Sequence, residues 1–417
     1  MKRIFGHELF RRSVLFSLSI IASTVVGVFS IPVLVASVGA VQWGSLAVMQ
    51  VIGQLVAVFI AFGWGATGPS MVSSHPPSER KAMFAESVVF RLVLLGVGAP
   101  VAIVLCIWLP GESWQNAVLA TITYILPGLS AAWYFVGTNR PVALFVFDAL
   151  PAILGQVLGL VAVLTWGGVT SYLASTALFA VVGTIASAVF ILTRSSDGHV
   201  RSAGVTPWRT LIRSQAAGVT STISASLWTA APMLLLQALS PAGVPVFAMV
   251  DRLMKYGVLA LAPILQAVQG WVPESGSDRI AVRARTSIRI SLFVGALGGL
   301  ALALLATPVS SLLTLGEATV PWPLATIAGA ALMAECVSQV VGLSALVALG
   351  GSRQLALSSL ASAIIGIPVI AILILWLGVY GAVIGILVVA TGVALYRTAH
   401  ALRLAGAAES SESGLGH

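Results

Sequence analysis

Long apolar runs, separated by short polar turns, repeat along the whole of this 417-residue chain. Many of them reach about 18 residues or more, the length that an α-helix needs to cross a bilayer. Hydrophobic residues make up 58% of the sequence and charged residues only 8%, which excludes a soluble domain. The runs also lack the strict alternation of a membrane β-barrel, whose strands face lipid and lumen in turn. The sequence therefore predicts an all-α, polytopic membrane protein.

We place about twelve transmembrane helices on these runs. They lie at roughly 13–36, 44–66, 88–109, 115–137, 142–165, 171–193, 215–238, 245–268, 288–307, 323–346, 355–376 and 378–396. An even number puts both ends of the chain on one side of the membrane. If that side is the cytoplasm, every basic residue except Arg252 and Lys255 falls on it, as the positive-inside rule requires.

The longest polar stretch inside the chain, residues 194–213, divides the helices into two sets of six. Weak internal similarity supports a duplication, since an Arg-Ser pair precedes a proline at the start of each set. We therefore expect two lobes, residues 1–200 and 201–400, around a central cavity. Residues 401–417, rich in Ser, Gly and Glu towards their end, are expected to form a disordered cytoplasmic tail.

A membrane hairpin is predicted over Leu129–Asp148. The first helix ends at Trp133–Gly137, whose aromatic side chains suit the lipid headgroup level. A short turn carries Arg140, and Pro141 suits the first turn of the next helix. Asp148 would then lie about 10 Å inside that helix. Because a carboxylate is costly in lipid, we expect Asp148 to face protein or water.

The eighth predicted helix holds the strongest candidates for a binding site. Asp251, Arg252 and Lys255 are charged residues in its outer half, with Lys255 about 15 Å deep. At 100° per residue, Arg252, Lys255, Gln266 and Gln269 share one stripe. Such a stripe is costly against lipid, so it is expected to line the cavity. The alternative is a structural ion pair between Lys255 and Asp251, which lie four residues apart.

Other polar residues lie inside the predicted spans. Gln50 and Gln54, on the second helix, either bind sugar hydroxyls or pack between helices. Glu335, near the midplane of the tenth helix, is either a proton or sodium site or a neutral, hydrogen-bonded group. Asp148 and Asp251 are further candidates for ion coupling.

Arg91 and Arg140 are expected near the cytoplasmic surface. There they either extend towards the headgroups or capture an anionic substrate. The net charge of +8 could point to nucleic acid, but these cations lie on membrane turns rather than on one soluble face, so no nucleic-acid partner is expected.

The sequence carries no signature of an enzyme. It shows no Walker loop, nucleophile elbow or metal-ligand spacing, and its longest predicted outer loop holds a single acidic residue. Cys106 and Cys336 lie in apolar segments, as small buried hydrophobes do. We expect no catalytic activity, no cofactor and no metal.

Three groups of residues carry a family resemblance: Pro32, Gly39, Trp43 and Gly44 with Gly63 and Gly65; Trp133–Gly137; and Val246–Ala248 with Asp251, Arg252, Leu253 and Pro273. They are similar to the corresponding segments of polysaccharide exporters of the O-antigen flippase (Wzx) type. That family belongs to the MATE-like (MOP) flippase superfamily, which also contains the MATE multidrug exporters and the lipid II flippase.

The resemblance implies a flippase of the bacterial inner membrane that moves a polyprenyl-diphosphate-linked oligosaccharide to the outer leaflet for cell-surface polysaccharide synthesis. It implies glycosyltransferases and a polysaccharide polymerase as partners. Flipping is driven either by the membrane potential alone or also by antiport of H+ or Na+ through Glu335 or Asp148. A diphosphate needs cationic donors, here Arg252, Lys255, Arg140 and Arg91, while the four glutamines would bind sugar. The alternative is a MATE-like drug or cation exporter, coupled to protons or sodium, for which an acidic cavity is expected.

Overall fold

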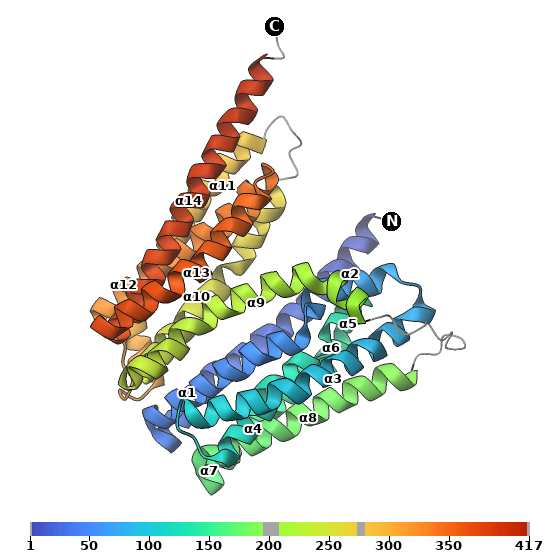
Figure 1. The fold of residues 1–417 in the computed structure, drawn as a ribbon, viewed down its shortest axis with the longest axis vertical. Coiled ribbons are helices and arrows are strands. Elements are labelled where there is room, and N and C mark those ends of the chain that lie inside the picture. Colours follow the sequence, from blue (N-terminus) through green and yellow to red (C-terminus); the bar gives the residue numbers. More distant parts are fainter. Residues whose placement is uncertain (1, 195–207, 273–279, 415–417) are drawn as a thin grey trace. The chain divides into compact units, whose positions relative to one another are not determined.

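The computed structural model describes residues 2–194, 208–272 and 280–414. Over these ranges the secondary structure is helical and contains no strand, as Figure 1 shows. Ten of the described helical segments are long and apolar enough to cross a membrane. The prediction of an all-α, polytopic membrane protein is confirmed.

The ten apolar spans cover eleven of the twelve predicted helices. The span Ile21–Ser74 contains two of them, because α1 (Lys2–Ala61) is broken at Gly39, where φ is 81° and ψ is 160°. Glycine adopts such a positive φ without steric cost. The twelfth predicted helix corresponds to α10 (Val244–Trp271), which spans 28 residues, carries Asp251, Arg252 and Lys255, and is not among the ten apolar spans.

The chain divides into two compact units, Met1–Ser226 and Leu227–His417. After α1, the first unit contains α2 (Trp64–Ser74), α3 (Pro77–Trp108), α4 (Trp114–Ile125), α5 (Ala132–Gly137), α6 (Pro141–Leu144), α7 (Leu150–Trp166) and α8 (Gly168–Arg194). Two short irregular helices interrupt this series: the 3-10 helix η1 (Leu126–Leu129) and the π-helix η2 (Phe145–Ala149).

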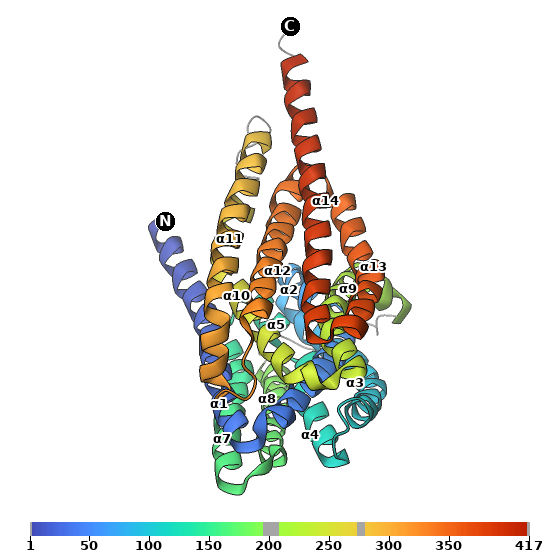
Figure 2. The ribbon, with the colours of Figure 1, turned by 90° about the vertical axis from the view of Figure 1, so that its left-hand side faces the viewer.

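The helix α9 (Trp208–Leu239) runs from the first unit into the second. After it come the 3-10 helix η3 (Pro241–Gly243), α10, α11 (Ile280–Leu313), α12 (Trp322–Val340), the π-helix η6 (Val341–Leu346), α13 (Ser352–Leu377) and α14 (Val379–Gly414). The helix α12 packs against both α11 and α14, and Figure 2 shows it between them. Gly299 and Gly329 face each other between α11 and α12, where a Cβ on either would clash with the other's carbonyl oxygen.

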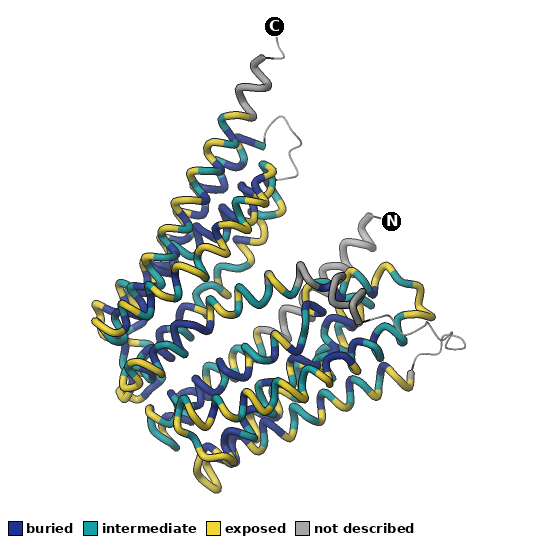
Figure 3. The backbone as a smooth tube through the Cα atoms, in the orientation of Figure 1, coloured by how far each residue is buried: buried dark blue, intermediate teal, exposed yellow. Residues whose placement is uncertain are grey.

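Many large apolar side chains are exposed along these helices. Figure 3 shows that exposed positions recur along each of them. Val97 on α3, Leu312 on α11 and Ile364 on α13 are examples. An apolar surface of this extent is unusual for a soluble protein and fits contact with lipid.

The division between the units differs from the one predicted at residue 200. It lies within α9, because the start of that helix packs on the first unit. The side-chain oxygen of Gln215 accepts a hydrogen bond from the Thr67 hydroxyl, and its amide nitrogen donates to Met71 Sδ at 3.3 Å. Part of the predicted polar boundary, residues 195–207, lies outside the described residues.

The predicted disordered tail, residues 401–417, also differs from the structure. The helix α14 continues to Gly414, so the described part of this segment is helical. Alanine and leucine dominate residues 401–408, and both have high helix propensity. Residues 415–417 lie outside the described ranges.

Candidate functional site

An ion pair on α10 forms the centre of the candidate site in the second unit. Lys255 Nζ lies 2.6 Å from Asp251 Oδ2, one helical turn away. The Lys255 side chain is 48% exposed and that of Asp251 is 21% exposed. The ion pair considered as an alternative role for these residues is therefore present, but its ammonium group stays accessible.

Glu335 lies on α12, which packs against α10. The two helices are closely packed nearby, where a Cβ on Gly257 would come within 2.8 Å of Leu332 Cδ2. Glu335 is partly buried, and no hydrogen bond to its carboxylate is present among the described residues. Glu335 therefore lies on the helix packed against the one that carries the ion pair, and a coupling role for it stays a prediction.

The predicted polar stripe of α10 lies on the side that the second unit leaves uncovered. Lys255 and Gln266 are exposed, and Arg252 and Gln269 are of intermediate exposure. The opposite side of the helix, which includes Val250 and Leu253, is buried. This placement is compatible with both a substrate pathway and lipid, so the lining role of the stripe stays a prediction.

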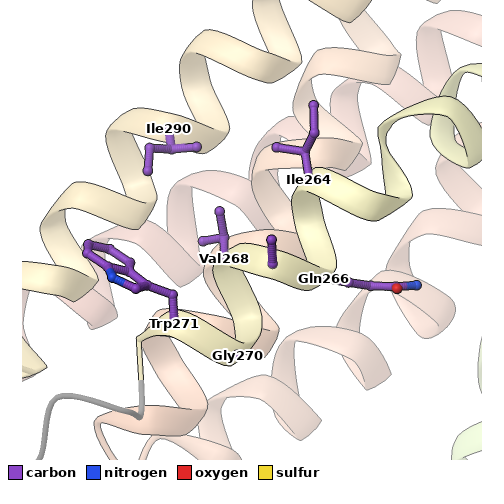
Figure 4. Close-up of a pocket in the computed structure, with 7 residues that line it drawn as sticks. Ile264, Gln266, Val268, Gly270, Trp271 and Ile290 are labelled. Atoms are coloured by element: carbon purple, nitrogen blue, oxygen red, sulfur yellow. The ribbon is translucent and has the colours of Figure 1, made fainter. Parts of the chain in front are cut away.

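A shallow cavity of about 720 Å³ lies near the end of α10, and Gln266 is one of the residues that line it. Ile264, Val268 and Trp271 line it together with Ile290 of α11. Figure 4 shows the side chains of Gln266 and Trp271 extending in opposite directions from the helix. The lining is mostly apolar, so the predicted sugar contact of Gln266 does not follow from this cavity.

Arg91 is buried in the first unit, with 1% of its surface exposed. Its Nη1 donates to the carbonyl oxygens of Gly128 at 3.2 Å and Ser130 at 3.0 Å, around the end of η1. Nε and Nη2 donate to the carbonyl and hydroxyl oxygens of Ser87, both at 3.1 Å. The expectation that Arg91 extends to the headgroups is wrong. Its guanidinium instead satisfies backbone carbonyls that the break after α4 leaves unpaired.

Asp148 lies in the π-helix η2 and accepts a hydrogen bond from Ser130 Oγ at 2.6 Å. Ser130 therefore joins the Asp148 carboxylate to the Arg91 guanidinium, which binds the Ser130 carbonyl oxygen. The carboxylate is exposed on the surface of the first unit. Irregular helical turns of this kind are frequent at functional sites of membrane transporters. Sequence reasoning missed Ser130, although a Gly and a Pro shortly before it indicate a helix break.

The predicted hairpin around Arg140 is confirmed in its backbone. Helix α5 ends at Gly137, Asn139 takes a positive φ of 57°, and α6 begins at Pro141. Arg140 is exposed in the turn.

The predicted headgroup position of the aromatic residues before this hairpin is wrong. Trp133 and Tyr134 are 4% and 5% exposed. The Trp133 ring lies 4.7 Å from that of Trp64, and the Tyr134 ring lies 5.4 Å from that of Phe84. These rings form an aromatic core because the break after α4 directs the segment into the first unit.

The two glutamines of the second predicted helix differ in environment. Gln54 is exposed, Gln50 is of intermediate exposure with interactions of its own, and Trp43, predicted on the same stripe, is fully buried. A sugar contact stays a prediction for both glutamines.

A second buried arginine, Arg397, was missed as a structural residue. It is 8% exposed, and its Nη1 donates to the carbonyl and hydroxyl oxygens of Ser338 at 3.0 and 3.1 Å. Nε donates to Ser358 Oγ and Nη2 to Ser359 Oγ, both at 2.8 Å. Serines recurring on two neighbouring helices were the signal in the sequence.

Within the described ranges, no group of three or more His, Cys, Asp or Glu side chains could hold a metal ion. Cys106 and Cys336 are buried and unpaired thiols.

Comparison with known proteins finds matches among solved structures only. No protein-family profile and no curated protein sequence matches the chain. Lipid II flippase MurJ in an inward closed conformation shares its fold with a TM-score of 0.68 and 13% identity, over 92% of this chain and 86% of that one.

MATE transporters share the fold as well. A mutant of VcmN from Vibrio cholerae gives a TM-score of 0.55 at 16% identity, over 96% of this chain and 98% of that one. A MOP superfamily transporter from Pyrococcus furiosus, described as having a binding pocket of reverse polarity, gives 0.56 at 15% identity, over 96% of both chains. The structural matches establish a common fold, and at identities this low they establish the fold alone.

Proposed function

We propose that the chain is a flippase that moves a polyprenyl-diphosphate-linked oligosaccharide from the cytoplasmic to the outer leaflet of the bacterial inner membrane. The observation that supports this most is the accessible ammonium of Lys255, whose side chain is 48% exposed on the 28-residue helix α10, which we propose crosses the membrane. Cations inside a membrane are costly and generally serve a function. The fold shared with lipid II flippase MurJ adds to this support.

In this proposal Lys255 and Arg252 bind the diphosphate during its passage. Charged N–H donors bind phosphate oxygens about twice as strongly as neutral donors do. Arg140, exposed in its turn, would capture the substrate at the cytoplasmic surface. Arg91 can bind the anionic substrate only if its four hydrogen bonds in the first unit are broken, so we assign it a structural role.

The sugar part would contact the uncharged polar residues, Gln50, Gln54, Gln266 and Gln269. Moving a diphosphate outwards is favoured by a negative interior, by about 2.3 kcal/mol per charge at 100 mV. Glu335, Asp251 and Asp148 are candidates for coupling to H+ or Na+. Glycosyltransferases and a polymerase remain expected partners, and both termini are placed in the cytoplasm.

A proteoliposome assay tests this function. A fluorescent polyprenyl-diphosphate oligosaccharide is followed between leaflets under an imposed potential. We expect flipping by the parent protein, a rate about tenfold or more lower for Lys255→Ala, and partial recovery in Lys255→Arg. Arg353→Ala, which removes an exposed cation outside the proposed pathway, is the matched control and should flip normally.

The rival function, export of drugs or cations, predicts a different result. The protein would then move a cationic dye in response to a proton or sodium gradient, without flipping the lipid-linked sugar. MATE transporters share the fold, and this outcome would replace the flippase proposal.

A further inference from the structure

Five tryptophan side chains of the described residues are between 52% and 82% exposed, and all five lie at helix ends. Each is the first or last residue of its helix, or one residue from the end: Trp108 of α3, Trp114 of α4, Trp166 of α7, Trp322 of α12 and Trp376 of α13. We propose that these exposed tryptophans form an interaction surface for the headgroup layer of the outer leaflet. The inference uses the membrane orientation proposed above and no step of transport.

In the first unit, the helix ends that carry exposed tryptophans lie together. A short loop joins α3 to α4, so Trp108 and Trp114 share one end of the unit. The hydroxyl of Thr170, near the start of α8, donates a hydrogen bond to Asn116 Oδ1 at 2.7 Å. This bond holds the turn that follows Trp166 beside the start of α4. The three indoles therefore lie at the same end of the first unit.

In the second unit, Trp322 and Trp376 also share one end. The helix α12 continues through η6 and reaches α13 after a short turn at Gly350 and Gly351. The chain thus runs down α12 and returns along α13, and both helices pack against α14. The start of α12 and the end of α13 therefore lie at the same end of this unit.

The side chains one helical turn inward from two of these tryptophans are exposed and apolar. Val104 precedes Trp108 by one turn of α3, and Ile372 precedes Trp376 by one turn of α13, so each pair shares a helix face. An indole has an apolar ring and one N–H donor, which suits the boundary between acyl chains and headgroups. A sugar-binding site would instead place hydrogen-bonding side chains around the ring. Lipid is thus the partner that this surface fits.

The opposite ends of the same helices carry cations. Arg353 lies about 34 Å from Trp376 along α13, and Lys81 lies about 40 Å from Trp108 along α3, at about 1.5 Å per residue. These lengths fit a bilayer whose hydrocarbon core is about 30 Å thick, or about 40 to 45 Å with its headgroups. Because cations favour the cytoplasmic side, the exposed tryptophans are assigned to the outer side.

The remaining tryptophans of described exposure are covered to a greater extent. Three are buried and one is of intermediate exposure: Trp43, Trp64, Trp133 and Trp228. Trp271, at the end of α10, is also of intermediate exposure, and the Arg283 guanidinium lies 4.7 Å from its ring centre. Arg283 Nη1 also donates to the Trp271 carbonyl oxygen at 2.6 Å. Among tryptophans of described exposure, the exposed ones are therefore confined to one end of each unit.

Depth-dependent fluorescence quenching of the full-length protein in liposomes tests the inference. The lipid carries bromine either near the headgroup or near the end of the acyl chain. Trp108→Phe, Trp166→Phe and Trp376→Phe each remove one indole, and the emission of the parent minus that of the variant belongs to that indole. We expect bromine near the headgroup to quench it about twofold or more strongly than bromine near the chain end. The three positions lie on separate helices, so the test survives one variant that fails to fold.

Trp43→Phe is the matched control, because Trp43 is fully buried. Its difference emission should be quenched far less by either lipid. Stronger or equal quenching by the deep bromine would place the exposed indoles among the acyl chains, and quenching by aqueous acrylamide alone would place them in water. Either result overturns the proposal. A response to free oligosaccharide, without quenching by brominated lipid, would identify a sugar-binding surface instead.

Cysteine labelling in spheroplasts tests the side of the membrane. Glu112→Cys places a thiol in the loop between α3 and α4, and Arg353→Cys places one at the start of α13. A membrane-impermeant maleimide should label the first variant in intact spheroplasts and the second only after permeabilisation. Both native cysteines are buried, so the parent protein is the blank.

The two experiments separate this inference from the proposed function. The reverse labelling pattern would overturn the assignment to the outer leaflet, and with it the cytoplasmic placement of both termini. Indoles at the wrong depth would overturn the headgroup surface but leave the flippase proposal standing, since none of the five tryptophans belongs to the proposed substrate pathway.

Discussion

Arg91 Nη1 donates a hydrogen bond to the carbonyl oxygen of Ser130 at 3.0 Å, at the point where α4 gives way to α5. The Ser130 hydroxyl in turn donates to Asp148 Oδ1 at 2.6 Å. A buried cation and an exposed carboxylate are thereby linked through one serine. This link gives the first three predictions.

Arg91→Met should destabilise the first unit by about 3 kcal/mol. The change leaves the carbonyl oxygens of Gly128 and Ser130 without a buried donor, and each loss of this kind costs about 1 to 3 kcal/mol. Thermal unfolding in detergent measures the effect. Arg140→Met, at an exposed position, should stay within about 0.5 kcal/mol of the parent. Equal losses in both variants would show that Arg91 has no special structural role.

Asp148→Asn should alter ion coupling more than it alters stability. Asparagine can still accept the Ser130 hydrogen bond through its carbonyl oxygen, but it cannot release or bind a proton. The flipping assay, run with and without a proton gradient, should lose its gradient dependence in this variant.

Ser130→Ala separates the two roles of this link. It removes the hydroxyl but keeps the backbone carbonyl that binds Arg91, so we expect a stability loss of about 1 kcal/mol and continued gradient dependence. Gradient dependence that survives in Asp148→Asn would exclude Asp148 as a coupling residue.

The class of fold was predictable from the sequence because lipid imposes a simple rule on it. A long apolar run must form a helix, and a break is marked by residues such as Gly39 or Pro141. The three charged residues on α10 were found in the same way, since charges inside a span are rare.

What the sequence could not supply was the direction of individual side chains. Arg91 and Arg397 looked like surface cations of the positive-inside kind, yet both are buried and donate hydrogen bonds to oxygens of distant segments. Trp133 was expected at the headgroups and instead packs on Trp64. Such contacts depend on where helices break and cross, which periodicity along one helix does not encode.

Gly329→Ala should weaken the packing of α11 on α12. A Cβ at this position would clash with the Gly299 carbonyl oxygen, which belongs to backbone and cannot rotate away. Overpacking of this kind costs about 1 to 3 kcal/mol. Thermal unfolding should show the loss.

Gly392→Ala, on α14, is the matched control for that change. No atom lies within 4 Å of a Cβ built there, so the alanine meets open space. Alanine is the better helix former by about 1 kcal/mol, and the melting temperature should rise or stay unchanged. A loss of stability as large as that of Gly329→Ala would show that close helix approach is not the cause.

The last prediction concerns Arg397, which joins α14 to two other helices through serine. Arg397→Ala should destabilise the second unit by about 2 to 3 kcal/mol, because its charged hydrogen bonds to Ser338 and Ser358 are lost in a buried place. A double-mutant cycle with Ser358→Ala should give a coupling energy of about 0.5 kcal/mol or more. Arg403→Ala, on an exposed turn of the same helix, should couple to Ser358→Ala by less than that. Equal coupling for both arginines would mean that a general charge effect, rather than the hydrogen bond to Ser358, holds the helices together.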